Sequence, residues 1–216
     1  MSGSETRPLT IDRHRTAVVV IECQNDLIHA DHIGGRGVSA ALAAAVKEGE
    51  VLPRIARVLS AAREAGVPVI YANKETKPGM PIAAAPIFRW SRRHPLLLEG
   101  TPGAEVHAAI APAPGDLVLR RFLSVDPSYG SGLFGTLRAL RRDTVIAMGV
   151  STNFAVEGTV RGAVNRSLTA IVPQDCCASA PLEMHRFSVE RILSLLATIT
   201  TGEAVVEALQ TSPSLP

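Results

Sequence analysis

The feature that most constrains the fold is an apolar run, TAVVVIEC, at Thr16–Cys23. Its β-branched residues show no alternation of polar and apolar positions, which is typical of a strand buried on both faces of a parallel sheet. Four further runs have the character of strands, at Val67–Ala72, Asp116–Arg121, Thr144–Val150 and Leu168–Pro173. Segments with helical spacing separate them. This alternation predicts βαβ units with right-handed crossovers, and hence an α/β fold with a doubly wound parallel sheet.

The helical segments follow from apolar residues three or four positions apart. The first begins at Val51 and is closed by Gly66, and the others are expected near residues 133–142, 152–164, 183–196 and 202–209. The 216 residues show no repeat and no second hydrophobic core. We therefore expect a single domain spanning residues 1–216, with flexible tails at 1–12 and 211–216. The Pro-rich stretch Lys77–Pro114 is longer than a loop that merely connects two elements of a compact domain, so we expect it to be functional.

Composition excludes several classes of protein. The formal net charge is only +2, and no Lys/Arg run is interleaved with aromatic residues, so we expect no nucleic-acid partner. No stretch of 18 or more apolar residues exists, so we expect no membrane span. An odd number of cysteines (Cys23, Cys176 and Cys177) and the lack of a signal peptide indicate a reducing, cytoplasmic location.

Ligands in open α/β sheets bind at the carboxyl ends of the strands. The residues directly after the predicted strands are 22–26, 73–77, 120–122, 149–155 and 175–177. We therefore expect a small-molecule site at this edge. The turn at Val150, Ser151 and Ala155 begins the helix after the fourth strand, where backbone N–H groups would point at an anionic or carbonyl oxygen.

Five segments carry a family resemblance: VVVIECQND (Val18–Asp26), PGDLVLRR (Pro114–Arg121), LFGTLRAL (Leu133–Leu140), GVSTNFAVEGTVRGAV (Gly149–Val164) and VPQDCCAS (Val172–Ser179). In this order and spacing, over nearly the whole chain, they resemble the isochorismatase-like hydrolases, also called the cysteine hydrolase superfamily. The resemblance implies a three-layer α/β/α sandwich with a largely parallel, six-stranded, Rossmann-like sheet. It also implies a homodimer or homotetramer, and a non-proline cis peptide at Val150–Ser151.

Many members of that family hydrolyse small amides or carbamoyl compounds with an Asp–Lys–Cys triad. The resemblance places Glu22, Arg121 and Ala155 at these three positions. A methyl group cannot attack a carbonyl, so Ala155 excludes a cysteine acyl-enzyme. Glu22 is either a general acid or base or the structural partner of Arg121. Arg120 is the alternative for the lysine position, because only one of two adjacent strand residues faces the site.

Further residues near this edge are candidates for substrate binding: Asn25, Asp26, Arg89, Trp90, Phe134 and Asn153. Arg89 and Trp90 belong to the run FRWSRRHP at Phe88–Pro95, which is either a surface or subunit-contact loop or a lid for an anionic substrate. Asp126 and Tyr129 are expected, like Phe134, to line the entrance of the predicted site.

No metal or other cofactor is expected, because the spacing of Asp26, His29, Asp31 and His32 fits no strong metal signature. Other nucleophiles are also poor candidates. Cys23 follows Glu22 on a strand and should point to the opposite face as a small buried hydrophobe. Ser151 and Thr152 are expected to cap the helix and frame the turn, because no His lies nearby in the sequence.

Three functions remain open. The first is a hydrolase of an amide, carbamoyl or vinyl-ether compound in which Glu22 works without a cysteine. The second is a catalytically inactive relative that binds a metabolite or a partner. The third is a Cys-to-Ala trap form of a cysteine amidohydrolase; the concurrent Glu22 and Arg121 favour a natural departure instead.

Overall fold

The computed structural model describes residues 8–33, 37–80, 85–88, 96–122 and 124–211. Its centre is a seven-stranded sheet in which every strand pair is parallel, in the order β3-β2-β1-β4-β5-β7 with β6 beside β4. The strands are β1 (Thr16–Ile21), β2 (Val69–Glu75), β3 (Leu117–Phe122), β4 (Thr144–Val150), β5 (Thr169–Pro173), β6 (Cys177–Ala178) and β7 (Thr198–Thr200).

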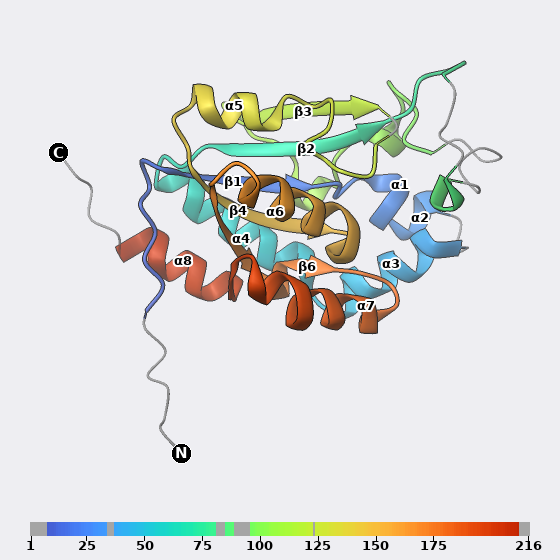
Figure 1. Cartoon of the computed structure of the whole chain (residues 1–216). Helices are drawn as coiled ribbons and strands as arrows, with labels where there is room; N and C mark the ends of the chain where they lie inside the picture. Colours follow the sequence, from blue (N-terminus) through green and yellow to red (C-terminus); the bar gives the residue numbers. More distant parts are fainter. Residues whose placement is uncertain (1–7, 34–36, 81–84, 89–95, 123, 212–216) are drawn as a thin grey trace.

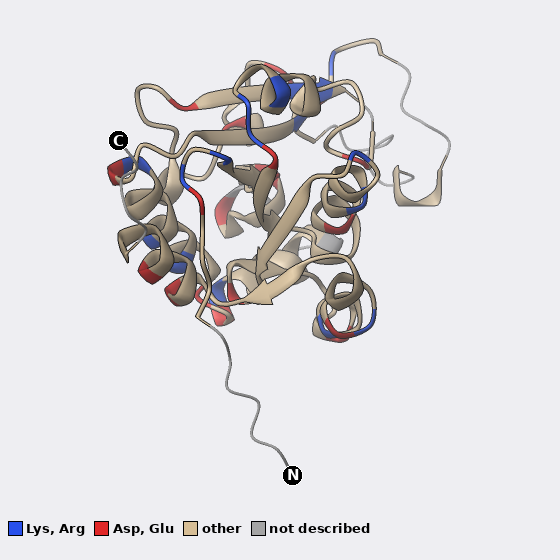
Figure 2. Ribbon diagram, turned by 60° about the vertical axis from the view of Figure 1, so that its left-hand side comes forward, with Lys and Arg blue, Asp and Glu red and all other residues tan. Residues whose placement is uncertain are grey.

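Helices cover both faces of this sheet (Figures 1 and 2). They are α1 (Asn25–Ile28), α2 (Ala30–Ile33), α3 (Gly37–Glu48), α4 (Val51–Glu64), α5 (Leu133–Ala139), α6 (Glu157–Val164), α7 (Leu182–Phe187) and α8 (Gly202–Thr211). α4 packs beside α8 in one layer, and α5 packs beside α6 in the other, where the Phe134 ring lies over Gly162. The predicted three-layer α/β/α sandwich with a doubly wound parallel sheet is confirmed.

Several short helices and strands were not predicted. β6 and β7 have two and three residues, too few for a periodic pattern to show. α1 to α3 are short or, in α3, dominated by alanine, so their apolar spacing is weak. The single helix expected near 183–196 consists of α7, a π-helical turn (Ser188–Ile192) and a 3-10 turn (Leu193–Leu195).

Burial explains why the strand runs look as they do. All six residues of β1 are buried, because β1 pairs with β2 and β4 at its sides and is covered by helices on both faces. The core cluster reaches from Ile11 to Leu209, and Arg13 donates a hydrogen bond to the Gln210 carbonyl (3.1 Å). The two ends of the described chain therefore lie side by side. Within the described ranges, no helix combines the length and apolar composition needed to cross a membrane.

Two points of the Pro-rich stretch, Leu97 and Ala104, are held at the carboxyl edge of the sheet. The amide of the fully buried Gln24 donates to the carbonyls of Lys74 (2.9 Å) and Ala104 (2.6 Å) and accepts from the Lys74 N–H (2.9 Å). The Thr76 N–H donates to the Leu97 carbonyl (2.8 Å). These bonds fix this part of the stretch against the residues that follow β1 and β2.

Gly149 is needed where β4 passes β1. It has φ +125°, and a Cβ there would overlap the Ile21 carbonyl and lie 2.8 Å from the Ile21 nitrogen. We expect Gly149→Ala to lower the free energy of unfolding by about 3 kcal/mol or more, because two backbones must separate. Urea unfolding followed by circular dichroism measures this loss.

Gly135→Ala is the matched control, because Gly135 lies in α5 and nothing would come within 4 Å of its Cβ. Alanine should raise the free energy of unfolding there by roughly 0.5–1 kcal/mol through its helix propensity. Equal effects of the two substitutions would show that Gly149 does not fix the spacing of the strands.

Candidate active site

Glu22 lies directly after β1, at the carboxyl edge of the sheet. Its backbone has φ 50°, in the left-handed region that a residue with a Cβ rarely adopts. The Glu22 N–H donates to the Ala72 carbonyl of β2 (3.3 Å), and the Glu22 carbonyl accepts from the Gln24 N–H (2.8 Å). Such conformations persist where the surroundings enforce them, and they concentrate at functional sites.

Arg121 of β3 forms an ion pair with Glu22 from two strands away. Its Nη2 bonds Glu22 Oε1, and its Nε donates to Ser124 Oγ (2.9 Å). The Arg121 side chain is fully buried, while the Glu22 side chain is 13% exposed. Within the described part of the chain, Arg121 Nη1 has no hydrogen-bond partner. The pair therefore leaves one guanidinium donor unsatisfied beside a carboxylate that solvent can reach.

The structure also resolves which arginine faces the site. Arg120 pairs with Glu75 (Nε to Oε1, 2.6 Å), whereas its neighbour Arg121 is aligned with Lys74 of β2 and turned to Glu22. Arg121, and not Arg120, therefore contacts Glu22, while the match of Arg121 to the lysine of the family stays a prediction.

Lys74 lies within the range 73–77 that the sequence predicts at this edge, although no role was predicted for it by name. It lies in β2 beside Arg121, and its ammonium is 4.2 Å from the centroid of the Phe88 ring. Burial lowers the pKa of Lys74, the charge of Glu22 raises it, and that of Arg121 lowers it. Arg121, Lys74 and Glu22 thus place two cations and one carboxylate at this part of the edge. The strand expected to end at Ala72 continues to Glu75, so Lys74 belongs to β2 and not to a loop.

The turn after β4 has the expected backbone. The Val150–Ser151 peptide is cis, and a π-helical turn (Thr152–Val156) leads into α6. Ala155 is buried, and its carbonyl accepts a hydrogen bond from Thr159 Oγ1 (2.9 Å). The expected side-chain cap is wrong, because no side-chain hydrogen bond caps the turn at Ser151. The role of these backbone N–H groups in holding an oxygen stays a prediction.

The same turn contacts a histidine. Thr152 Oγ1 lies 2.8 Å from His185 Nδ1 of α7, so a His does lie near the turn in space, although it is 33 residues away in sequence. The Thr152 side chain is fully buried. This pair therefore ties α7 to the turn and does not present an accessible hydroxyl. Asn153 is held similarly by Ser179, through its N–H (3.2 Å) and its Oδ1 (2.8 Å).

The other predicted substrate-binding residues fall in different places. Asn25 Nδ2 donates to the Pro102 carbonyl (2.8 Å), and Asp26 Oδ2 accepts from the Leu97 N–H (2.7 Å). Both side chains therefore hold Leu97 and Pro102 against the carboxyl edge of the sheet. Phe134 lines a pocket with Arg15 and Leu168, which precede β1 and β5, so the structure does not bring it beside Glu22. Arg89 and Trp90 lie outside the described residues.

No thiol replaces the missing nucleophile. Cys23, Cys176 and Cys177 are all buried and free. Burial raises the pKa of Cys177 to about 12 and also raises those of Cys23 and Cys176. Since the thiolate is the reactive form, these cysteines are structural. Within the described part of the chain, no three His, Cys, Asp or Glu side chains gather into a metal-binding group.

Comparison with known proteins agrees with this geometry. The isochorismatase domain model matches residues 16–204. A ureidoacrylate amidohydrolase RutB of Methylorubrum extorquens is 31% identical, over 94% of this chain and 86% of that protein. This chain therefore belongs to the isochorismatase domain family.

Two solved structures show the same fold. A cysteine hydrolase from Pseudomonas syringae pv. phaseolicola has a TM-score of 0.76 and 25% identity, covering 95% of this chain and 99% of that one. An N-carbamoylsarcosine amidase from Thermoplasma acidophilum has a TM-score of 0.70 and 28% identity, covering 88% and 97%. The family expected from the five sequence segments is confirmed.

The His185 contact gives a pH-dependent stability. Burial, and then the charge of Arg186, lower the pKa of His185 from its ordinary value of 6.5. Below about pH 6.5 the unfolded chain thus binds the proton more readily, so the folded state loses stability as the pH falls. We expect His185→Gln to remove about 0.5 kcal/mol of this loss between pH 7 and pH 5, a value discounted for solvent screening. Urea titrations at both pH values measure it.

His14→Gln is the control, because His14 is exposed near the start of the described chain. Its pH dependence should match that of the wild type. If His185→Gln and His14→Gln show the same pH dependence, the burial of His185 is not the cause.

Proposed function

We propose that this protein hydrolyses a small amide or carbamoyl compound with Glu22 as the general base and without a covalent intermediate. The observation that carries the proposal is the Glu22–Arg121 pair at the carboxyl edge, beside Lys74 and the turn that ends in Ala155. The amidohydrolase and amidase named among the relatives support an amide substrate.

The ion pair favours a base over an acid. Arg121 donates a hydrogen bond to Glu22 Oε1, so Glu22 takes part in the pair as an acceptor, which is also the role of a general base. Protonation of a vinyl ether would instead require Glu22 to act as a donor. Hydrolysis of an amide or carbamoyl group begins with removal of a proton from water, and this is the step that a paired carboxylate can perform.

The reaction then follows from the positions of the groups. Glu22 takes a proton from a water molecule whose oxygen attacks the carbonyl carbon, and the carbonyl oxygen becomes an oxyanion. The backbone N–H groups of the turn at Ser151 and Ala155 hold that oxyanion. The C–N bond breaks as the nitrogen receives the proton from Glu22, and the products are an acid and an amine or ammonia.

Arg121 and Lys74 have a different role from Glu22 in the proposed reaction. Arg121 Nη1 has no partner among the described residues, and Lys74 lies in a largely desolvated position that lowers its pKa. Both would bind an anionic group of the substrate or the charge that develops on it. Asn25, Asp26, Asn153 and the segment with Arg89 and Trp90 are proposed to border the substrate.

A catalytically inactive binding protein is the second candidate. The observation that favours it is the same ion pair, because a Glu22 fully occupied by Arg121 is not free to activate water. An anionic metabolite would then bind the unpaired Nη1 of Arg121 without turnover. Assembly into a homodimer or homotetramer is compatible with either candidate and is likewise proposed.

Glu22→Gln tests the first candidate. The amide cannot accept the proton of water, so we expect kcat to fall by at least about 100-fold on a substrate found by screening amides and carbamoyl acids. Glu75→Gln is the matched control, because Glu75 also pairs with a β3 arginine. It should leave kcat within about threefold of the wild type. Steady-state kinetics measures both.

Circular dichroism and melting temperature show whether each variant is folded, and Glu22→Asp adds a variant that retains a carboxylate. Full activity of Glu22→Gln, or no difference from Glu75→Gln, would exclude Glu22 as the base. Saturable binding of a screened compound without turnover by the wild type would favour the inactive protein.

Ala155→Cys tests whether the chain is a trap form of a cysteine enzyme. We expect no gain in amide hydrolysis, because the surrounding carboxylate and cation also depart from the family's Asp and Lys. The measurement is turnover of the same amides, with mass spectrometry of the protein for an acyl adduct. A gain of 100-fold or more with a detectable adduct would show that Ala155 stands in place of a working nucleophile.

A further inference from the structure

The guanidinium group of Arg121 is held by the loop that follows β3 (residues 124–132) as well as by Glu22. Arg121 Nε donates to Ser124 Oγ (2.9 Å). Its Nη2 bonds Glu22 Oε1 and, at 3.4 Å each, the carbonyls of Ser124 and Val125. Nε and Nη2 lie on one edge of a rigid planar group, so the short bond from Nε fixes how the plane is turned. Ser124 therefore determines which nitrogen of Arg121 meets Glu22.

The hydroxyl group of Ser124 is itself oriented by the loop. It donates to the Asp126 carbonyl (2.9 Å), and the Tyr129 carbonyl is a second acceptor at 3.2 Å. A serine hydroxyl has one hydrogen and two lone pairs, so the oxygen can accept from Arg121 Nε while its hydrogen is used within the loop. Arg121 and the loop thus hold each other through one hydroxyl group.

The same loop is anchored on α6, the helix that begins just after Ala155. Asp126 Oδ1 accepts from the N–H (2.8 Å) and from Oγ (2.7 Å) of Ser128. Ser128 Oγ lies 3.3 Å from the position of a Cβ on Gly162, and the Asp126 Cα lies 3.6 Å from that of a Cβ on Gly158. The loop therefore packs directly on α6 and connects that helix with Arg121.

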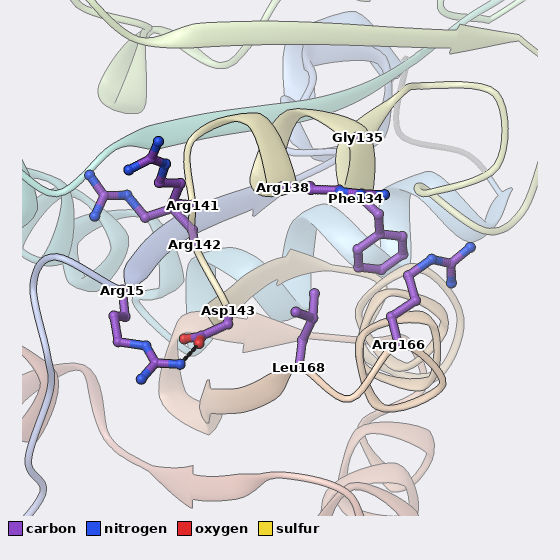
Figure 3. Close-up of a pocket in the computed structure, with 9 residues that line it drawn as sticks. All are labelled: Arg15, Phe134, Gly135, Arg138, Arg141, Arg142, Asp143, Arg166 and Leu168. Atoms are coloured by element: carbon purple, nitrogen blue, oxygen red, sulfur yellow. Dashed lines mark hydrogen bonds and ion pairs between the residues drawn. The ribbon is translucent and has the colours of Figure 1, made fainter.

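The far end of the loop leads into α5, which also packs on α6. The Phe134 ring comes within 2.7 Å of the position of a Cβ on Gly162. The Arg166 guanidinium lies 4.3 Å from the centroid of the same ring, as Figure 3 shows from the side of α5. The loop is thus supported on one helix both at its middle and at its end, which gives Ser124 a fixed position relative to the turn after β4.

We propose that Ser124 is a positioning residue that orients Arg121 for the reaction. A guanidinium has a plane and a fixed set of donors, unlike an ammonium, so its action depends on how that plane is turned. With Nε on Ser124 and Nη2 on Glu22 Oε1, Arg121 Nη1 and Glu22 Oε2 remain for substrate and water. The role of Ser124 thus rests on the proposed function, in which these two atoms act.

Ser124→Ala removes the acceptor of Nε and lets the guanidinium turn to occupy both oxygens of Glu22. We expect kcat/KM on a substrate found by screening to fall about tenfold, as for one lost hydrogen bond to a charged group. Ser124→Thr keeps the hydroxyl and should stay within about threefold of the wild type. If the wild type binds a screened compound without turnover, the Kd of that compound should rise by the same factor.

Ser131→Ala is the matched control, because it removes another hydroxyl of the same loop, one that accepts from the Leu133 N–H (3.2 Å). It should leave kcat/KM within about twofold of the wild type. Melting temperatures show whether each variant is folded. Ser124→Val, which has the shape of Ser124→Thr without the hydroxyl, repeats the test if Ser124→Ala does not fold.

Nuclear magnetic resonance of the full chain, with its arginines enriched in nitrogen-15, tests the contact without any substrate. Arg121→Lys identifies the Nε–H signal of Arg121 by its loss. This signal should shift and exchange faster with water in Ser124→Ala, but stay in place in Ser124→Thr and Ser131→Ala. An unchanged signal in Ser124→Ala would overturn the proposal, and so would a shifted signal with unchanged kcat/KM. If Glu22→Gln keeps full activity, the proposed base is wrong, whereas these spectra still show whether Ser124 orients Arg121.

Discussion

The parallel pairing of β1 with β2 on one side and β4 on the other is the constraint on which the rest of the molecule depends. It brings the carboxyl ends of three strands to one edge, so that Glu22, Lys74 and the turn after Val150 become neighbours. The pairing requires both faces of β1 to be covered, and the two layers of helices do this. The left-handed backbone of Glu22 then carries its side chain towards Arg121, while Cys23 is buried.

Much of this could be predicted from the sequence, because strand burial and helical spacing are local signals. The five longest buried runs and the family resemblance predicted the fold class, and a Glu22–Arg121 pair was one of the two alternatives for Glu22. The choice of Arg121 over Arg120 as the partner of Glu22 required the register of β3 against β2, which no local pattern contains. Lys74 was predicted at the edge only as part of the range 73–77, because polar residues at the end of β2 resemble a loop. His185 was missed because α7 meets the turn only in three dimensions.

The site combines two opposing properties. The ion pair with Arg121 holds the Glu22 carboxylate in place at the edge, but it also occupies one of the two oxygens. In the proposed reaction, Glu22 Oε2 is the oxygen that takes the proton of water. Among the described residues Arg121 Nη1 has no partner, so a bound anion could redistribute the hydrogen bonds of the pair. The proposed reaction would thus link substrate binding and release of the carboxylate through one guanidinium group.

The residues of the proposed site also determine how the protein would respond to oxidants. Reactive thiolates are the first groups in a protein that peroxide converts to sulfenic and sulfinic acids. The three cysteines of this chain are buried, and their raised pKa values keep them as thiols. Neither a carboxylate nor a guanidinium is open to this chemistry. The proposed site, with Glu22 and Arg121 and no thiol, would thus be independent of the redox state of its surroundings, unlike a site that uses a cysteine thiolate.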